Sequence, residues 1–429
     1  MVYVLNKDGK PLMPSIRHGK IRRMLKEKKA VVVKTTPFTV KLLYTPKTNV
    51  IQNLVLGIDP GSRTLSTVVR VEKTPKLVYV SEVKVRTDIT SKLKKRSSYR
   101  KTRRNRKTRY RESRFLNRKR KEKWLPPSVV SKLNSHKKEI KFIFNILPVS
   151  RVILERNTFD THKLKNPSIS GKGYKHGTLY SYENHRQYVL TRDKYCCRSC
   201  KKKNVVLNTH HITFKSKGGK DHYSNLVTLC ETCHKKVHSG KLKLHKKLLA
   251  SLGTSVNTLD ATHATIISKR LEEFLLKHKD RRNYKFLTTF GYETVVKRRI
   301  LKLKKTHYND AISISYPIKT SYSKTRAEFM FRKISVSKGD YQQTKGVRSQ
   351  VKIPTCKIHG FRKFDIVQYL GKYYIIKGRM SSGYAILMNS KLKPVNFGTN
   401  GKSKPTVNFK LLKRISSRRS TLIIEVRKH

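Results

Sequence analysis

Acidic residues are scarce in this chain. It carries 25 Asp and Glu against 101 Lys and Arg among 429 residues, a formal net charge of +76. Self-repulsion on this scale destabilises a compact fold unless a polyanion neutralises it. We therefore expect a long nucleic acid as the partner. The length allows roughly two to four domains with sizeable cores.

Long apolar runs are missing as well. No run approaches the roughly 18 residues of a membrane-spanning helix, and no basic amphipathic anchor stands out, so we expect no membrane partner. Residues 1–7 have neither the charged nor the apolar region of a signal peptide. Cysteines number only six, and four have metal-type spacing, which fits a reducing compartment better than a disulfide framework. The other two, Cys196 and Cys356, are expected to be inert thiols.

The four spaced cysteines form two CxxC pairs in one short segment. Cys197 with Cys200 and Cys230 with Cys233 can close as thiolates on one tetrahedral Zn²⁺. The surplus of imidazoles in this segment predicts a second metal site, for phosphodiester hydrolysis. The alternative is a zinc ribbon that only binds nucleic acid. The histidines beyond what the zinc needs are His210, His211, His234 and His238.

Three of the few carboxylates stand in apolar elements that lie far apart in the sequence. Asp59 and Glu155 end strand-like runs, and Asp310 stands at the start of a helix-like stretch. Two divalent ions about 4 Å apart that clamp a phosphate need oxygen ligands of this kind, and Mg²⁺ prefers carboxylates. His307 stands one helical turn before Asp310 and is a candidate to activate water or stabilise the leaving group. For Asp59 the alternative is a β-meander in which it only caps a turn.

Residues 92–123 are strongly basic, since 18 of these 32 positions are Lys or Arg, opposed only by Glu112 and Glu122. A helix this polar on all sides has no stripe to bury in a core. Lys and Arg are good helix formers, so the run predicts a long arginine-rich helix that lies along phosphates. The alternative is a solvated charge run. The arginines predicted to bind nucleic acid are Arg96, Arg100, Arg103, Arg104, Arg106, Arg109, Arg111, Arg114 and Arg118.

Short β-type runs occur at both ends of the chain. Residues 1–50 mix them with a basic helix-like stretch, which predicts a small α+β cap. From about residue 320 onward, alternating strands with glycine turns predict a small barrel-like module. Residues 161–180 and 239–257 read as linkers, so the metal segment between them is predicted to be an inserted domain.

The metal segment resembles the HNH, or ββα-metal, endonuclease family. The resemblance implies that His211 is the general base, that His210 and His234 hold one Mg²⁺-type ion with His238 as a further ligand, and that Asn225 positions His211. The four cysteines would be structural. The matching motifs are Cys197-x-x-Cys200, His210-His211-Ile212, Gly218-Gly219, Asn225-Leu226 and Cys230-x-x-Cys233-His234-x-x-x-His238.

The whole arrangement resembles IscB, the transposon-encoded, RNA-guided nuclease group thought ancestral to the CRISPR type II effectors. Residues 320–429 share only their position and β character with it. The resemblance implies a multidomain α/β fold: an RNase H-like (RuvC) mixed sheet split in three segments, an inserted ββα-metal HNH domain, a long arginine-rich bridge helix and a small β-barrel-like C-terminal module. The matching motifs are Pro11-Leu12-Met13-Pro14, Gly57-Ile58-Asp59-Pro60-Gly61, Leu154-Glu155 and His307-Tyr308-Asn309-Asp310-Ala311.

The same resemblance divides the chain into seven parts. These are 1–52, a PLMP cap; 53–91, RuvC-like segment I; 92–125, the bridge helix; 126–180, RuvC-like segment II and a linker; 181–250, the HNH domain with its zinc knuckles; 251–320, RuvC-like segment III; and 321–429, a β domain that contacts the target-adjacent motif.

The function implied is RNA-guided DNA cleavage. A large noncoding guide RNA (ωRNA) would pair with one strand of a double-stranded DNA beside a short motif. The HNH site would nick the paired strand, and a RuvC-like site built on Asp59, Glu155, His307 and Asp310 would nick the displaced one, with Mg²⁺ or Mn²⁺ at both. We expect a monomeric protein in a ribonucleoprotein, in prokaryotic cytoplasm at the nucleoid or of organellar origin. The rival interpretations are an RNA-independent homing-type HNH endonuclease and a non-catalytic RNA-binding protein.

Overall fold

The structure is a computed structural model, in which the chain divides into two compact units. One comprises Met1–Asn157 and His263–His429, and the other Thr158–Thr262. No helix in the described part of the chain is both long and apolar enough to span a membrane. The residues described are 1–46, 50–105, 122, 124–158, 181–214, 222–244, 258–317, 329–337, 357–398, 403–418 and 420–427.

The first unit begins with a small α+β layer, as the sequence predicts. Strand β3 lies between β1, which is parallel to it, and β2, which is antiparallel, and one helix packs on the sheet. The Tyr3 hydroxyl donates a hydrogen bond of 2.9 Å to the carbonyl of Val78 in the neighbouring sheet. The elements are β1 (Tyr3–Leu5), α1 (His18–Lys26), β2 (Ala30–Lys34) and β3 (Thr39–Leu42).

A seven-stranded mixed sheet forms the body of this unit, in the order β10-β7-β4-β5-β6-β11-β17. Strands β4, β7 and β10 run parallel, whereas β5 is antiparallel to both of its neighbours. The strands are β4 (Leu54–Pro60), β5 (Thr64–Val71), β6 (Leu77–Lys84), β7 (Val149–Arg156), β10 (Lys285–Phe290), β11 (Met330–Ser335) and β17 (Thr421–Arg427). The helices are α2 (Ile89–Arg104), α3 (Pro127–Phe144), α8 (Leu259–Arg282), α9 (Gly291–Ile300) and α10 (His307–Ile314).

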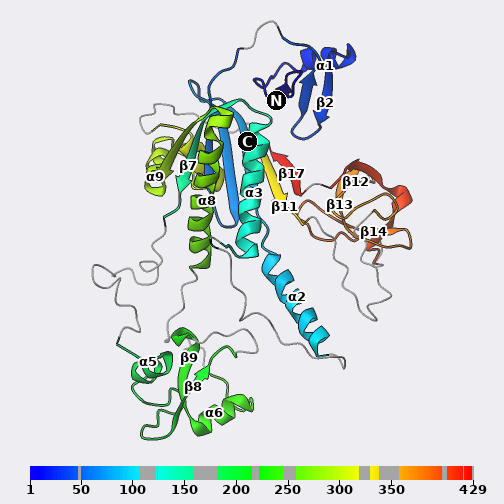
Figure 1. Cartoon of the computed structure of the whole chain (residues 1–429). Helices are drawn as coiled ribbons and strands as arrows, with labels where there is room; N and C mark the ends of the chain where they lie inside the picture. The colour runs from blue at the N-terminus through cyan, green and yellow to red at the C-terminus, as the bar shows by residue number, and fades with distance from the viewer. Residues whose placement is uncertain are drawn as a thin grey trace. The chain divides into compact units, whose positions relative to one another are not determined.

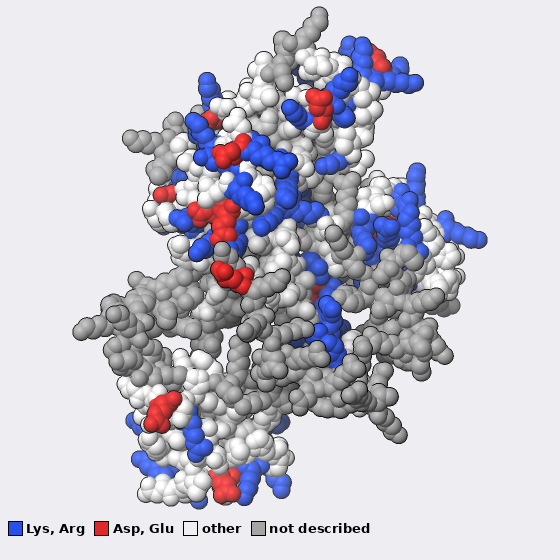
Figure 2. All heavy atoms as spheres, in the orientation of Figure 1, with Lys and Arg blue, Asp and Glu red and all other residues white. Residues whose placement is uncertain are grey.

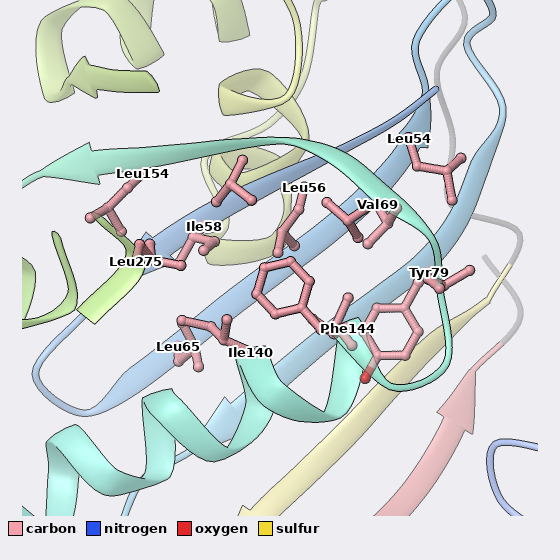
Figure 3. Packing of buried hydrophobic residues seen from close by; sticks show 14 of the residues in the cluster. Leu54, Leu56, Ile58, Leu65, Val69, Tyr79, Ile140, Phe144, Leu154 and Leu275 are labelled. Carbon is pink, nitrogen blue, oxygen red and sulfur yellow. The ribbon is translucent and has the colours of Figure 1, made fainter. Parts of the chain in front are cut away.

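Helices cover both faces of this sheet, which explains why its central strand β4 is buried along its whole length (Figure 1). The side chains of Leu54, Leu56 and Ile58 point to the face packed by α3 and α8 (Figure 3). The intervening side chains of β4 point to the opposite face, where Val55 contacts Ile314 of α10. Side chains alternate along a strand, so Asp59 belongs to the α10 face.

A buried ion pair ties α3 to the sheet. The Glu139 carboxylate, 4% exposed, accepts hydrogen bonds from Lys333 of β11 at 2.8 Å and from Tyr79 of β6 at 2.6 Å. Ser81 donates a further bond of 2.8 Å to the same carboxylate. Removal of one partner from such a pair leaves a buried charge uncompensated. The pair therefore joins α3 to β6 and β11.

The second unit is built on a two-stranded antiparallel hairpin followed by a helix. The hairpin and the helix share a small core with the cysteines, in which Val227 and Leu229 are fully buried. Its elements are α5 (His185–Arg192), β8 (Leu207–His211), a 3₁₀ turn (Tyr223–Asn225), β9 (Leu226–Cys230) and α6 (Glu231–His238).

A five-stranded antiparallel sheet follows in the C-terminal part of the first unit, in the order β15-β14-β13-β12-β16. It has its own core around Val367, Ile376 and Leu387. The barrel-like closure expected from the sequence stays a prediction. The strands are β12 (Ile366–Tyr369), β13 (Lys372–Arg379), β14 (Tyr384–Met388), β15 (Thr406–Asn408) and β16 (Lys413–Ser416), with a 3₁₀ turn at Phe409–Leu411.

The chain is a mixed α/β protein with a mixed central sheet, as expected, but its C-terminal segment differs from the expected single module. Strands β11 and β17 both lie beyond residue 320, yet they join the central sheet instead of the five-stranded one. An alternating pattern identifies a strand without saying which sheet it joins.

Part of the arginine-rich helix is described. Helix α2 ends at Arg104, and it carries Arg96 and Arg100. The side chains of Arg103 and Arg104 are not described. Arg106, Arg109, Arg111, Arg114 and Arg118, the predicted linker at 161–180 and Cys356 lie outside the described residues.

Candidate active sites

The first candidate site lies where two parallel strands of the central sheet end. Ile58 of β4 pairs in register with Leu154 of β7, so Asp59 and Glu155 follow at the same level of neighbouring strands. Ile153 and Val55 share a small cluster with Ile314 of α10. Residues two apart share a face, so both carboxylates belong to the face that α10 covers.

Helix α10 brings the other two predicted residues to this place. His307 Nδ1 lies 3.3 Å from Asp59 Oδ2. Asp310, one turn further along the helix, pairs with the guanidinium of Arg298 in α9. Gly57 permits the close approach of the helix, because a Cβ there would lie 2.5 Å from the Ala311 carbonyl oxygen. All four sequence-predicted residues are thus brought together.

The carboxylates act on one another electrostatically. Burial, together with the charge of Asp310, raises the pKa of Asp59. Burial and then the charges of Asp59 and Asp310 raise the pKa of Glu155 to about 7, although Thr294 Oγ1 donates to Glu155 at 3.2 Å. The hydrogen bond to Asp59 raises the pKa of His307. Buried groups with mutually perturbed pKa values are typical of functional sites.

The acidic residues do not form a closed ligand set. Among the described residues, only two groups of three or more side chains bring ligand atoms within 4.8 Å of one another, and the carboxylates are not one of them. Asp59 instead engages His307, and Asp310 engages Arg298. Carboxylates repel one another without a cation between them, which explains these pairings. The oxygen donors themselves suit Mg²⁺ or Mn²⁺.

The sequence patterns did not predict several residues that lie at this site. Thr294 and Arg298 lie one turn apart on α9, a helix that the sequence patterns did not indicate. Ser66 lies opposite Asp59 on one side and Glu82 on the other. Its buried hydroxyl has no hydrogen-bond partner in the described part of the chain. Sequence spacing carries no signal for these residues, because they meet only through strand register and helix packing.

Three side chains, two of them on α3 and one directly after β7, hold the turn after Asp59. Asn157 Nδ2 donates to the Pro60 carbonyl at 2.8 Å, and Lys132 Nζ donates to Ser62 Oγ at 2.7 Å. His136 of α3, whose pKa burial lowers to about 4, contacts the Gly61 carbonyl with Nε2 at 3.1 Å. These contacts keep Asp59 in place at the strand end.

A pH dependence of stability follows from Glu155. In the folded metal-free chain Glu155 has a pKa of about 7, whereas the ordinary pKa of a glutamate side chain is 4.5. The unfolded state therefore binds fewer protons between these values, and stability falls as pH rises through the window. We expect the melting temperature of the wild type, relative to Glu155→Gln, to fall from pH 4.5 to pH 7.

Thermal unfolding in chelator across that window measures the difference. Mg²⁺ should reduce this pH-dependent difference in melting temperature between the wild type and Glu155→Gln, because a cation favours the ionised carboxylate. Glu273→Gln, which alters an exposed carboxylate on α8, is the matched control. Parallel pH curves for the wild type and Glu155→Gln would contradict the assignment.

The second candidate site lies in the other unit, at the end of the β8–β9 hairpin where β8 ends and β9 begins. His210 pairs in register with Val227 and His211 with Leu226. The hairpin is followed at once by α6, which carries His234 and His238 one turn apart on one face.

Three of these histidines form a ligand group. Nitrogens of His210, His234 and His238 lie within 4.8 Å of one another, which fits a divalent ion. Burial, followed by His234 and His238, lowers the pKa of His210 to about 4. A neutral imidazole keeps a lone pair for a metal, so the lowered pKa leaves His210 ready to act as a ligand at neutral pH. His211 is not in this group.

Asn225 fixes the backbone that follows His211. Its side-chain oxygen accepts from the Thr213 amide at 2.9 Å, and its side-chain nitrogen donates to the Thr213 carbonyl at 3.1 Å. Its own carbonyl accepts from the Ile212 amide at 2.9 Å. These three bonds restrain the chain directly after His211, so the geometry is that of a positioning residue.

The four spaced cysteines also come together. All four sulfurs lie within 4.8 Å of one another, and the Cys200 and Cys230 sulfurs are 3.6 Å apart. Sulfurs bound tetrahedrally to Zn²⁺ at about 2.3 Å lie roughly 3.8 Å apart, so the donor set fits zinc. Cys196 stays outside the group, and its thiol donates to the Asp193 carbonyl.

Two family models match parts of the chain. Residues 195–240 match the HNH endonuclease family, and residues 2–177 match the family described as RRXRR protein. The chain is 35% identical over 65 residues to anaredoxin from Nostoc sp., covering 15% of this chain and 86% of that protein. It is 32% identical over 82 residues to the type IV methyl-directed restriction enzyme EcoKMcrA of Escherichia coli K12, covering 17% of this chain and 29% of the enzyme.

Among solved structures, the chain is similar to Streptococcus thermophilus Cas9 in complex with an AGGA PAM, at 12% identity and a TM-score of 0.31. The match covers 59% of this chain and 32% of that one. The complex with an AGAA PAM gives 12% identity and a TM-score of 0.32 with the same coverage. The chain thus spans about a third of these Cas9 chains. The chain therefore carries an HNH endonuclease domain in residues 195–240 and an RRXRR region in residues 2–177.

Proposed function

We propose that the chain is an RNA-guided DNA endonuclease of the IscB type, with two nuclease sites in one polypeptide. The observation that carries the proposal is the presence of two chemically different clusters in separate units. Imidazoles gather in the unit Thr158–Thr262, and mutually coupled carboxylates gather on the central sheet of the other. The HNH family match supports phosphodiester hydrolysis at the first cluster.

In the HNH site we assign the proton transfer to His211. It follows the ligand His210 in β8, acts on that imidazole electrostatically, and precedes the backbone that Asn225 restrains. His210 and His234 would hold the divalent ion, with His238 as a further ligand. The four cysteines would hold Zn²⁺ and keep the hairpin against α6 without taking part in the chemistry.

In the acidic, RuvC-like site, Asp59, Glu155 and Asp310 would hold Mg²⁺ or Mn²⁺. Such ions, when bound, polarise the scissile phosphate and lower the pKa of bound water. Asp310 must part from Arg298 to serve as a ligand, which leaves that guanidinium beside the site. His307 keeps its contact with Asp59 and lies where it can move a proton.

Guide RNA and double-stranded DNA are the proposed partners. The formal charge of +76 requires a polyanion, and Lys and Arg cover far more of the described surface in Figure 2 than Asp and Glu. We assign HNH cleavage to the guide-paired strand and RuvC-like cleavage to the displaced strand. The seven-part division of the chain, with its bridge helix and its motif-contacting β domain, belongs to the same proposal.

Sequencing of the RNA that co-purifies with the full chain tests the guide. We expect one discrete RNA, and nuclease removal of that RNA should abolish site-specific cutting of a matched DNA duplex. Add-back of the transcribed RNA should restore it. The double variant Asp59→Asn with His211→Ala should carry the RNA without cutting. Specific cutting that persists after RNA removal would favour an RNA-independent HNH endonuclease, and no cutting with bound RNA would favour a non-catalytic RNA-binding protein.

A further inference from the structure

Helix α9 reaches the acidic cluster with one of its faces. At its first residue, Gly291, an added Cβ would lie 3.2 Å from Glu155 Oε1. Thr294, about one turn further on, donates to Glu155 Oε2 at 3.2 Å, and Arg298, one more turn along, pairs with Asp310. Residues three, four and seven positions apart lie on one side of a helix. One face of α9 therefore serves two carboxylates of the site.

The ion pair between Arg298 and Asp310 is largely withdrawn from solvent. The arginine side chain is 12% exposed and the aspartate side chain 18%. Nη1 of Arg298 donates to Oδ1 of Asp310, and this is the one side-chain hydrogen bond of Arg298 in the described part of the chain. None of its other nitrogens is among the buried polar atoms that lack a partner in the described residues. These nitrogens are therefore accessible to a ligand that enters the site.

Arg298 differs from the neighbouring Lys297 in burial and in chemistry. Lys297 is 6% exposed, and burial lowers its pKa although the charges of Glu293 and Glu155 oppose this. Arg298 is less buried, and a guanidinium keeps its charge at any physiological pH. Its planar set of donors matches phosphate oxygens, which a lysine meets only as a point charge. Arg298 is therefore the cation of α9 that suits a phosphate.

Arg298 and a divalent ion compete for Asp310. The guanidinium engages Oδ1, an oxygen of the carboxylate that would hold a Mg²⁺-type ion in the proposed acidic site. When a pair this buried is broken, the cation that is left without its partner is costly. A phosphate can take the place of the lost carboxylate, because a guanidinium donates two parallel N–H bonds to its oxygens. The ion and the phosphate therefore each compensate one member of the broken pair.

We propose that Arg298 is a substrate-binding residue of the acidic site: Asp310 holds it until a divalent ion takes that carboxylate, and it then pairs with a non-bridging oxygen of the scissile phosphate. The inference rests on the proposed RuvC-like function of this cluster. It makes the binding of the ion and of the phosphate mutually dependent. Without DNA, Arg298 opposes the binding of the ion. With DNA, it stabilises the charge that develops on the phosphate.

Binding of Mn²⁺ to the RNA-free full chain tests the competition without any cleavage. Electron paramagnetic resonance reports the free Mn²⁺, and a background of His210→Ala with His234→Ala removes two ligand candidates of the HNH site. In this background, Arg298→Met should bind Mn²⁺ about tenfold more tightly than its parent, because the competing charge is gone. Asp310→Asn should weaken Mn²⁺ binding, which identifies the acidic cluster as the site that is measured.

Strand-resolved nicking at saturating Mn²⁺, with the HNH histidines intact, should change in the opposite direction. Arg298→Met should nick the displaced strand about a hundredfold more slowly, the usual effect of losing one preorganised donor to a developing charge. The guide-paired strand should be nicked at the wild-type rate, because its proposed site lies in the other unit. Arg298→Lys keeps the charge without the planar donors, so its Mn²⁺ affinity and its nicking rate should lie between those of the wild type and Arg298→Met.

Arg299→Met is the matched control, since it removes the same charge from the next position of α9, which is exposed. It should leave the Mn²⁺ affinity and both nicking rates within a few fold of the wild type. Weaker Mn²⁺ binding together with slower nicking in Arg298→Met would overturn the inference, because loss of a purely structural contact has that effect. An unchanged Mn²⁺ affinity, an unchanged nicking rate, or an equal effect of Arg299→Met would also overturn it.

Failure of the proposed function has a different result. If Asp310→Asn leaves both Mn²⁺ binding and displaced-strand nicking unchanged, the carboxylates are not a metal site and both proposals fall. If Asp310→Asn loses both while Arg298→Met behaves like the wild type, only the role of Arg298 is wrong.

Discussion

Replacing His211 by alanine is expected to slow the nicking of the guide-paired strand by about a hundredfold to ten-thousandfold, the usual contribution of a positioned general base. The displaced strand should be nicked at the wild-type rate, because the acidic cluster lies in the other unit. The three metal-ligand candidates and the cysteines are untouched by the change. A DNA duplex matched to the co-purified RNA and labelled on both strands reports the two cuts separately.

His185→Ala is the matched control, since it removes an imidazole at the start of α5 in the same unit and outside the ligand group. It should leave both rates within a few fold of the wild type. A His211→Ala protein that nicks both strands at the wild-type rate would contradict the assignment. A His185→Ala protein whose nicking of the guide-paired strand slows as much as that of His211→Ala would also contradict it.

Replacing Gly57 by alanine is expected to abolish nicking by the acidic site and to destabilise the first unit. An added Cβ would lie 2.5 Å from the Ala311 carbonyl oxygen and 3.0 Å from the Ser315 amide nitrogen. Both are backbone atoms of the α10 region, so no side-chain rotation relieves the overlap. The helix must move away from β4 and take His307 and Asp310 with it. Overpacking of this kind costs about 1–3 kcal/mol or more.

Thermal unfolding and strand-resolved nicking measure the two effects of Gly57→Ala. HNH cleavage should survive, because its residues belong to the other unit. Gly19→Ala is the control: it lies in α1, where a Cβ meets nothing within 4 Å, and it should be neutral or slightly stabilising. Retention of acidic-site nicking in a Gly57→Ala protein of wild-type stability would show that α10 does not have to lie so close to β4.

The two clusters differ in how far the sequence could predict them. The cysteines and histidines of the HNH domain stand within about one hairpin and one helix, so fixed spacing leads almost directly to the ligand groups. The acidic site is assembled from distant segments. The sequence indicated its members, because Asp59 and Glu155 end strand-like runs and His307 and Asp310 begin a helix. The interstrand register and the packing of α10 bring these residues together.

The remaining features depend on tertiary contacts that carry no local signal. Arg298 meets Asp310 only because α9 packs beside α10, and the burial of Glu139 depends on Lys333, far along the chain. Ile89 and Leu93 lie one turn apart on α2 among many charged residues, so the composition of this segment concealed its short apolar face. Such features follow from the choice of packing partner, which periodicity does not encode.

The central claim is that one chain carries two independent hydrolytic sites. The most direct test is the strand-resolved nicking assay with the bound RNA, carried out on Asp59→Asn, on His211→Ala and on the double variant. We predict that Asp59→Asn loses only the displaced-strand cut, that His211→Ala loses only the guide-paired cut, and that the double variant cuts neither strand. Loss of both cuts in either single variant, with DNA binding and melting temperature unchanged, would contradict it.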